Sequence, residues 1–271
     1  MATRGFSIGA VLLSYFLVAG GIVLALILLA KSKITGEAPF YAALALGGAI
    51  GGAFAARASR GSTVLEPALG GLLVIATIVA IFVGTDAGAF LWHVAKDEIV
   101  RTVAIAGACA AAGAVLGAMA GERLPGGHSQ GSPVWLLHVA FAMLGACFVA
   151  TVLAVGLAFH GAADSDGALG GILFAAMAIG ALLTGLVVGA SAPRRILLII
   201  FLGVMAGVMG FYLLATMLPN TNSDKAGEAA AGFAIIGAGC GLLGILGGAI
   251  GWRAVGKRAA ATAEATSRAF A

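Results

Sequence analysis

The chain has 271 residues, of which 61% are hydrophobic and only 10% are charged, and its mean hydropathy is +1.11. A soluble domain usually carries about 25% charged residues, so too few polar side chains remain here to cover a water-facing surface. The composition therefore excludes a soluble globular protein, and the net charge of +4 gives no reason to expect nucleic-acid binding.

Apolar runs along the chain predict an all-α fold, a polytopic transmembrane helix bundle of about eight spans. Each run approaches or exceeds the roughly 20 residues that cross a bilayer. The first run is longer than the roughly 7–15 apolar residues of a secretion signal, so we expect an uncleaved first helix. The predicted spans are residues 7–30, 40–57, 64–84, 99–120, 133–159, 168–190, 194–217 and 229–252.

The connection between the third and fourth spans predicts a short helix that lies on the membrane surface. Ala87, Phe90, Leu91 and Val94 follow the spacing i, i+3, i+4 and i+7, which gathers apolar side chains on one helix face. The same segment holds the densest group of polar side chains in the chain, including His93. We expect either a plain connector or a docking surface or lid.

The even-numbered spans share an ending in which glycines precede a basic residue. Glycine stands six residues before Arg57, Arg123 and Arg253, and five residues before Arg194. These basic residues are 66, 71 and 59 positions apart, which favours four repeated helical hairpins. The predicted organisation is one membrane domain, residues 1–258, with hairpins at 1–60, 61–124, 125–192 and 193–258, followed by a short tail, 259–271.

Glycines four residues apart let two helix backbones approach closely, and this favours helix association in lipid. We therefore predict that the even-numbered helices form the interior of the bundle, with their small faces inward. The alternative is that GxxxG spacings arise by chance in so glycine-rich a chain. The predicted helix-packing residues are Gly47, Gly48, Gly51, Gly52, Gly113, Gly117, Gly121, Gly185, Gly189, Gly244, Gly247, Gly248 and Gly251.

The distribution of Lys and Arg predicts the orientation of the chain. With eight spans, ten of these residues lie on the side that carries both termini and five lie on the other side. Positive residues are retained in the cytoplasm. We therefore expect both termini to be cytoplasmic and the protein to lie in the cell (inner) membrane.

Few residues are candidates for chemistry, and no Asp, Glu, Lys or Arg falls in the middle of a predicted span. Glu66 comes closest, beside Pro67 at the start of the third span, where an acid complements the helix dipole. The alternative is a proton or cation site that pairs Glu66 with Arg57 or Arg60.

The histidines give no clear metal or haem site. His93 and His160 fall on the same predicted side of the membrane, where a zinc or copper ion is conceivable, but no HxxxH or CxxC spacing supports it. His138 lies five residues into the fifth span without a partner histidine at its depth, as a haem site of two histidines would need. We therefore predict no cofactor and no metal.

Two classes of function remain open. Small-residue faces, minimal loops and the lack of buried charge favour a non-catalytic structural or accessory subunit of a larger membrane assembly. Its partners would be the lipid bilayer and other membrane subunits or further copies of itself. Repeated hairpins and glycine-interrupted spans favour instead a transporter or channel for a small solute or ion. An enzyme is not expected, because no acid–base or metal constellation occurs at one depth.

Overall fold

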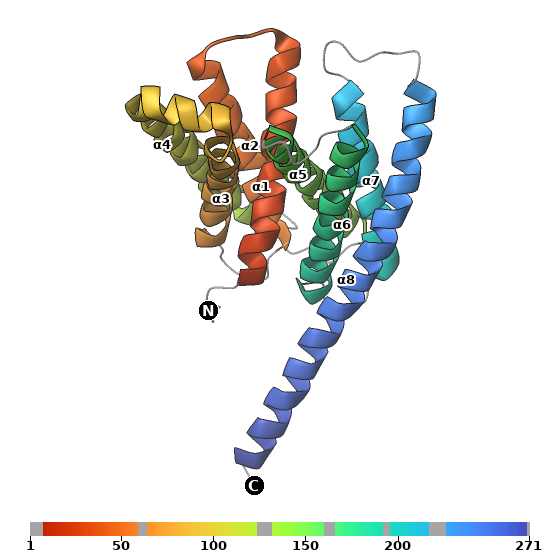
Figure 1. The fold of residues 1–271 in the computed structure, drawn as a ribbon. Helices are drawn as coiled ribbons and strands as arrows, with labels where there is room; N and C mark the ends of the chain where they lie inside the picture. Colours follow the sequence, from red (N-terminus) through yellow and green to blue (C-terminus); the bar gives the residue numbers. More distant parts are fainter. Residues whose placement is uncertain are drawn as a thin grey trace.

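The computed structural model of the protein describes residues 8–58, 64–123, 132–159, 166–191, 196–216 and 226–269. Within these ranges the chain forms eight α-helices and no strand, and each helix is long and apolar enough to cross a membrane. The predicted fold class is confirmed, and the chain is a multi-pass membrane protein. The helices are α1 (Ile8–Ser32), α2 (Glu37–Ala58), α3 (Leu65–Val83), α4 (Asp86–Arg123), α5 (Ser132–Phe159), α6 (Asp166–Ser191), α7 (Leu197–Thr216) and α8 (Ala226–Ala269) (Figure 1).

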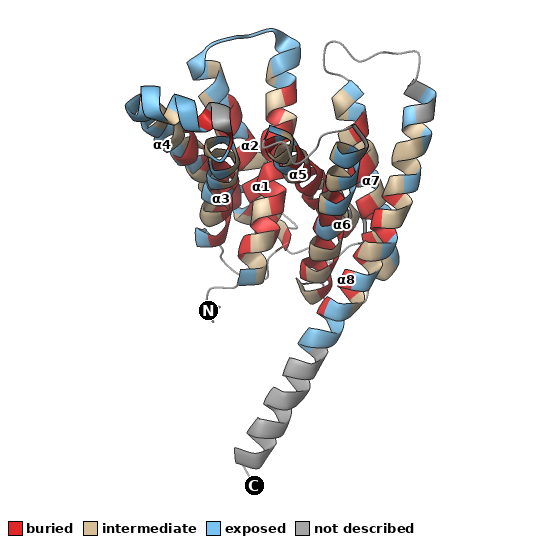
Figure 2. Ribbon diagram, viewed as in Figure 1, coloured by how far each residue is buried: buried red, intermediate tan, exposed pale blue. Residues whose placement is uncertain are grey.

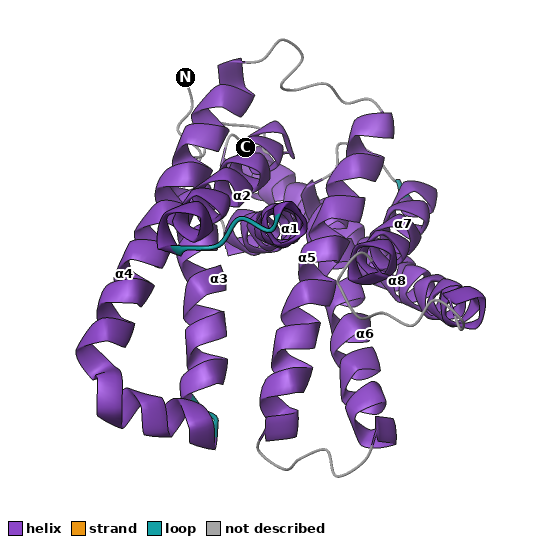
Figure 3. Ribbon diagram, turned by 90° about the horizontal axis from the view of Figure 1, so that it is seen from above, coloured by secondary structure: helices purple, strands orange, loops and turns teal. Residues whose placement is uncertain are grey.

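Six helices agree with the predicted spans to within a few residues, whereas α4 and α8 are longer. α4 begins at Asp86 and so includes the segment predicted to lie on the membrane surface. Its backbone leaves the helical conformation at Ala95 (φ −131°, ψ 34°), and Figure 3 shows the first segment running at a steep angle to the rest of the helix. α8 continues to Ala269, so most of the predicted tail is helical.

The centre of the bundle is formed by α1 and α5 (Figure 2). In the most apolar stretch of α1 72% of the residues are buried, against 56% in α5 and 33–39% in the other six helices. The expectation that the even-numbered helices form the interior is therefore wrong. They pack in two separate pairs, α2 with α4 and α6 with α8, which make the most extensive helix contacts. Glycine faces join helices at short range, but larger side chains are needed to fill a centre.

Helices α1–α4 and α5–α8 form two halves with the same pattern of helix contacts. In each half the second helix packs on the fourth, the first packs on the second and the third, and the third packs on the fourth. The halves meet chiefly through α1 and α5. The contacts thus recur with a period of four helices, while the four-hairpin repeat, with a period of two helices, stays a prediction.

The contact between α1 and α5 is reciprocal. A Cβ atom placed on Gly20 would collide with the carbonyl oxygen of Phe141, and one placed on Gly145 would collide with that of Phe16. Both pairs are related by a shift of 125 residues, from 20 to 145 and from 16 to 141. Reciprocal contacts of this kind are typical of elements related by a two-fold axis.

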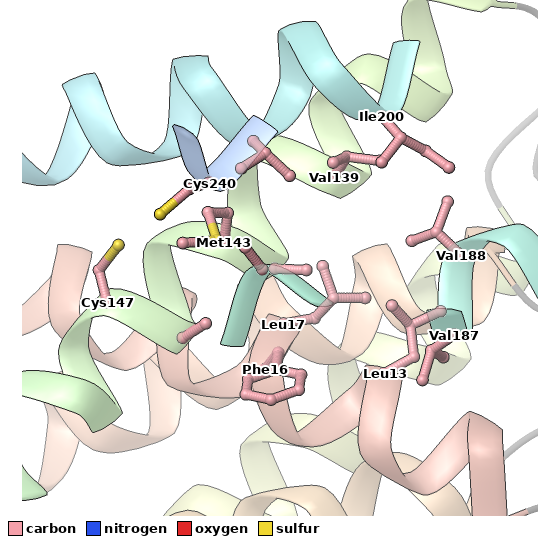
Figure 4. Close-up of a cluster of buried hydrophobic side chains, with 14 of the residues drawn as sticks. Leu13, Phe16, Leu17, Val139, Met143, Cys147, Val187, Val188, Ile200 and Cys240 are labelled. Atoms are coloured by element: carbon pink, nitrogen blue, oxygen red, sulfur yellow. The ribbon is translucent and has the colours of Figure 1, made fainter. Parts of the chain in front are cut away.

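Apolar side chains from α1, α5, α6, α7 and α8 fill the space at this junction (Figure 4). Leu17, Val139, Met143 and Cys147 have no exposed surface. In lipid the surroundings of a helix are as apolar as its interior contacts, so close van der Waals packing holds such a core together. The halves are therefore joined by a tightly filled apolar contact.

Candidate functional site

The predicted helix-packing glycines of α2 and α4 lie where these helices meet. A Cβ atom on any of four of them would collide with a backbone carbonyl oxygen of the opposite helix. Only a residue without a side chain permits this separation of the two backbones. The four contacts are Gly48 with Ala110, Gly52 with Ala114, Gly113 with Ala45 and Gly117 with Ala49.

The glycines of α6 and α8 make the same set of contacts in the second half. Every α6 partner follows its α2 counterpart by 137 residues, and every α8 partner follows its α4 counterpart by 134. The two helix pairs therefore match residue by residue at their closest approach. The four contacts are Gly185 with Gly244, Gly189 with Gly248, Gly247 with Leu182 and Gly251 with Leu186.

Three further predicted glycines also lie against backbone. Gly47 and Gly51 face α1, at Ile22 and Val18, and Gly121 faces α2. Two helices thus use the glycines of α2 at once, α1 on one face and α4 on the other. How much these contacts contribute to stability stays a prediction.

His138 is buried where the two halves converge, with 1% of its surface exposed. Its Nδ1 lies 2.6 Å from the carbonyl oxygen of Val134, one turn earlier in α5, and its Nε2 lies 2.9 Å from the carbonyl oxygen of Phe54 in α2. The ring also packs edge-on against Phe54, with 5.5 Å between the centroids, and beside Trp135. His138 therefore links the second half to the first.

The protonation state of His138 determines how many of the two carbonyl oxygens receive a hydrogen bond from the ring. A neutral imidazole carries one N–H and can donate to only one of them, whereas an imidazolium carries two and can donate to both. Arg57 lies three residues after Phe54 on α2, so a second basic residue follows the carbonyl that His138 contacts. The Arg57 Nε is itself buried without a hydrogen-bond partner among the described residues. His138 is thus a buried ionisable group whose ring nitrogens contact backbone oxygens of both halves.

Glu66 is buried, with 8% of its surface exposed, in the first turn of α3. Pro67 is the third helical residue, where the backbone has no intrahelical acceptor to satisfy, so the proline costs no hydrogen bond. In the described part of the chain no ion pair joins Glu66 to Arg57, and Arg60 lies outside it. A site that pairs these groups stays a prediction.

The remaining predicted histidines do not meet in the described structure. His93 is exposed on the first segment of α4, and His160 lies outside the described residues, so their pairing is untested. In the described ranges no three His, Cys, Asp or Glu side chains gather as metal ligands. The face of the same segment that carries Phe90 and Val94 is open, with 66% and 69% of these side chains exposed.

No protein-family model, no curated protein and no solved structure matches this chain. Its function is therefore argued from its own geometry. Sequence reasoning weighed His138 only as a haem ligand and missed its bridge to α2. No local signal marks that bridge, because Phe54 precedes His138 by 84 residues and supplies only a backbone carbonyl.

Proposed function

We propose that the protein is a non-catalytic structural or accessory subunit of a larger membrane assembly. The observation that carries this proposal is a set of glycines that nothing in the described chain covers. A Cβ atom on any of them would meet no heavy atom within 4 Å. Small-residue faces are where transmembrane helices associate, so a partner helix fits there. These open glycines are Gly170, Gly171, Gly210, Gly227, Gly232 and Gly239.

The filled junction between the halves supports the same proposal. Side chains such as Leu17 and Met143 occupy the middle of the molecule with no exposed surface. A solute pathway through a membrane protein needs polar groups or water along its length. A packed apolar centre suits a protein that acts through its outer surface.

We infer that both termini face the cytoplasm and that the protein lies in the cell (inner) membrane. Ten of the fifteen Lys and Arg residues belong to the side of the termini. In short loops this bias sets orientation. Partners of the proposed subunit are other membrane proteins or further copies of this chain.

The test compares two glycines on one helix, two turns apart. Gly247→Leu forces a side chain into the backbone of α6, and overpacking a tight interior costs about 1–3 kcal/mol, so abundance and monodispersity should fall. Gly239→Leu meets open space, so the protein should stay folded but lose its companions on purification in mild detergent. Ile235→Leu, at a side chain 74% exposed, is the matched control and should retain both.

The subunit proposal fails if the wild-type protein purifies as a single-copy particle without companions. It also fails if Gly239→Leu and Ile235→Leu retain the same companions in the same amounts. Mass spectrometry of the purified complex identifies the companions and separates foreign subunits from self-association.

A second candidate function is transport of a small solute or ion, and the junction at His138 favours it. Transporters are frequently built from two similar halves with the transport site between them. An ionisable residue within the membrane is a functional candidate by default. Under this alternative, purified protein in liposomes would carry proton-dependent flux, and His138→Leu would abolish the flux without loss of abundance.

A further inference from the structure

An apolar groove lies between α3 and α5, near the ends of these helices that are remote from the N-terminus. Its volume is about 310 Å³. It is lined by three residues of α3, by Thr85 in the connection to α4 and by five residues of α5. The groove is open at its edge, where Phe82, Val155 and Phe159 are 42%, 45% and 66% exposed. Both helices are membrane spans, so the groove lies at a depth where lipid surrounds the protein.

The chemistry of the lining selects an apolar ligand. Thr85 and Thr151 supply its only hydroxyl groups. The Thr85 hydroxyl donates to the carbonyl oxygen of Phe82 at 2.7 Å, and the Thr151 hydroxyl donates to that of Cys147 at 2.9 Å. Both hydroxyl groups are thus engaged with backbone oxygens close by in the sequence. A polar ligand would lose its hydrogen bonds to water on entry and find no donor in return.

The matching position between α7 and α1 shows how this groove differs from its counterpart. The contact of Gly70 with Ser14 matches that of Gly203 with Val139, so α3 maps onto α7 by a shift of 133 residues and α1 onto α5 by 125. The groove residues Ile78, Ile81 and Val152 therefore correspond to the residues Phe211, Leu214 and Ile27.

Between α7 and α1 these counterparts fill the space themselves. Ile27 is buried in a cluster with Val23 and Leu144, against which Phe211 and Leu214 pack. The larger phenylalanine stands where the groove has Ile78. The open space between α3 and α5 is therefore not imposed by the shared architecture, because the same arrangement is closed by side chains at α7 and α1.

The surroundings of the groove favour a lipid chain as its occupant. Both lining helices are membrane spans, so the open edge of the groove faces lipid hydrocarbon. A hydrocarbon chain is thin enough to enter and would restore the van der Waals contacts that an empty apolar space lacks. We propose that the α3–α5 groove binds one acyl chain of a membrane phospholipid, with the headgroup at the membrane surface beside the first segment of α4.

Photo-crosslinking tests this proposal on the complete protein. The protein is placed in phosphatidylcholine vesicles that contain phosphatidylcholine with a diazirine on its acyl chain, then irradiated, and the labelled residues are mapped by mass spectrometry. We expect a several-fold excess of label on the groove residues of α3 and α5 over the matching residues of α7 and α1. The matching position between α7 and α1 of the same molecule thus serves as an internal control.

Two variants place in the groove the residues that occupy the matching positions of α7 and α1. Ile78→Phe introduces the residue at position 211, and Thr151→Leu introduces the residue at position 26. Each should remove most of the excess label while abundance and elution volume stay unchanged, and Thr151→Leu suffices if Ile78→Phe does not fold. Equal labelling of the two places in the wild type, or an excess that survives in a folded variant, would overturn the proposal. Absence of label from the groove would mean that a partner's side chain fills it, which also overturns it.

Discussion

At the scale of single residues, His138 shows how one polar side chain is accommodated in an apolar interior. Burying a polar group costs free energy unless it is hydrogen-bonded, and both ring nitrogens find carbonyl oxygens. The matching position in α1, 125 residues earlier, is Leu13, which is also buried. An apolar residue therefore fits this position in the architecture, and the histidine adds a link between α5 and α2.

Replacing His138 with leucine should keep the fold but weaken it. The variant loses the hydrogen bond to the Phe54 carbonyl, which corresponds to about 0.5–1.5 kcal/mol. Thermal unfolding in detergent measures the change, with His93→Leu as an exposed control that should stay within about 0.5 kcal/mol of the wild type. A His138→Leu protein as stable as that control would show that the bridge contributes nothing.

At the scale of elements, the first segment of α4 differs from every span in its surroundings. Phe90 and Val94 are exposed on one face, and the chain turns at Ala95 into the long part of the helix. An amphipathic helix of this kind lies in the membrane interface with its apolar face toward the lipid. The connector and the lid alternatives share this position and differ only in what the polar face contacts.

Spin labels on the two faces of this segment should report opposite environments. A label at Phe90 or Val94 should be accessible to oxygen, which partitions into lipid, because both side chains leave the protein surface on the apolar face. A label at Ala89 or His93, which lie away from that face and are exposed, should be accessible to a water-soluble relaxation agent. Equal accessibility at all four positions in vesicles would show that the segment does not lie in the interface.

At the scale of the whole molecule, the packing relates two four-helix halves, joined through α1 and α5. The shifts that relate them are 125, 137, 133 and 134 residues from the first to the fourth helix pair. Arg57 maps onto Arg194 under the second shift, and Arg123 maps onto Lys257 under the fourth. Each half begins and ends on the same side of the membrane, so the halves share one orientation.

Reporter fusions should reveal this orientation directly. Fusions after Arg60, Arg123, Arg195 and Arg258 should be cytoplasmic, because the excess of Lys and Arg lies on that side. Fusions near Glu37, Glu98, Asp166 and Lys225 should lie on the opposite side. A reversed pattern at all eight positions would refute the inferred orientation, and a single discrepant fusion would show a miscounted span.

The sequence alone determined the class of this protein and the position of its helices. Eight apolar runs are sufficient for that, because each must span a fixed hydrocarbon thickness. It also marked glycines that lie at the contacts of α2 with α4 and of α6 with α8. The sequence and the structure align the repeat differently. Counting back six residues from Arg123 and Arg253 pairs Gly117 with Gly247, whereas the helix contacts pair Gly117 with Gly251.

Only the tertiary structure decided which helices are central, how the halves correspond and where His138 and the α3–α5 groove lie. In water, apolar periodicity reveals the buried face of a helix, because the other face must be polar. In a membrane both the lipid and the interior are apolar, so the sequence of a span does not distinguish its neighbours. The centre of α1 and α5, the bridge from His138 to Phe54 and the space beside Ile78 all depend on that choice of neighbours.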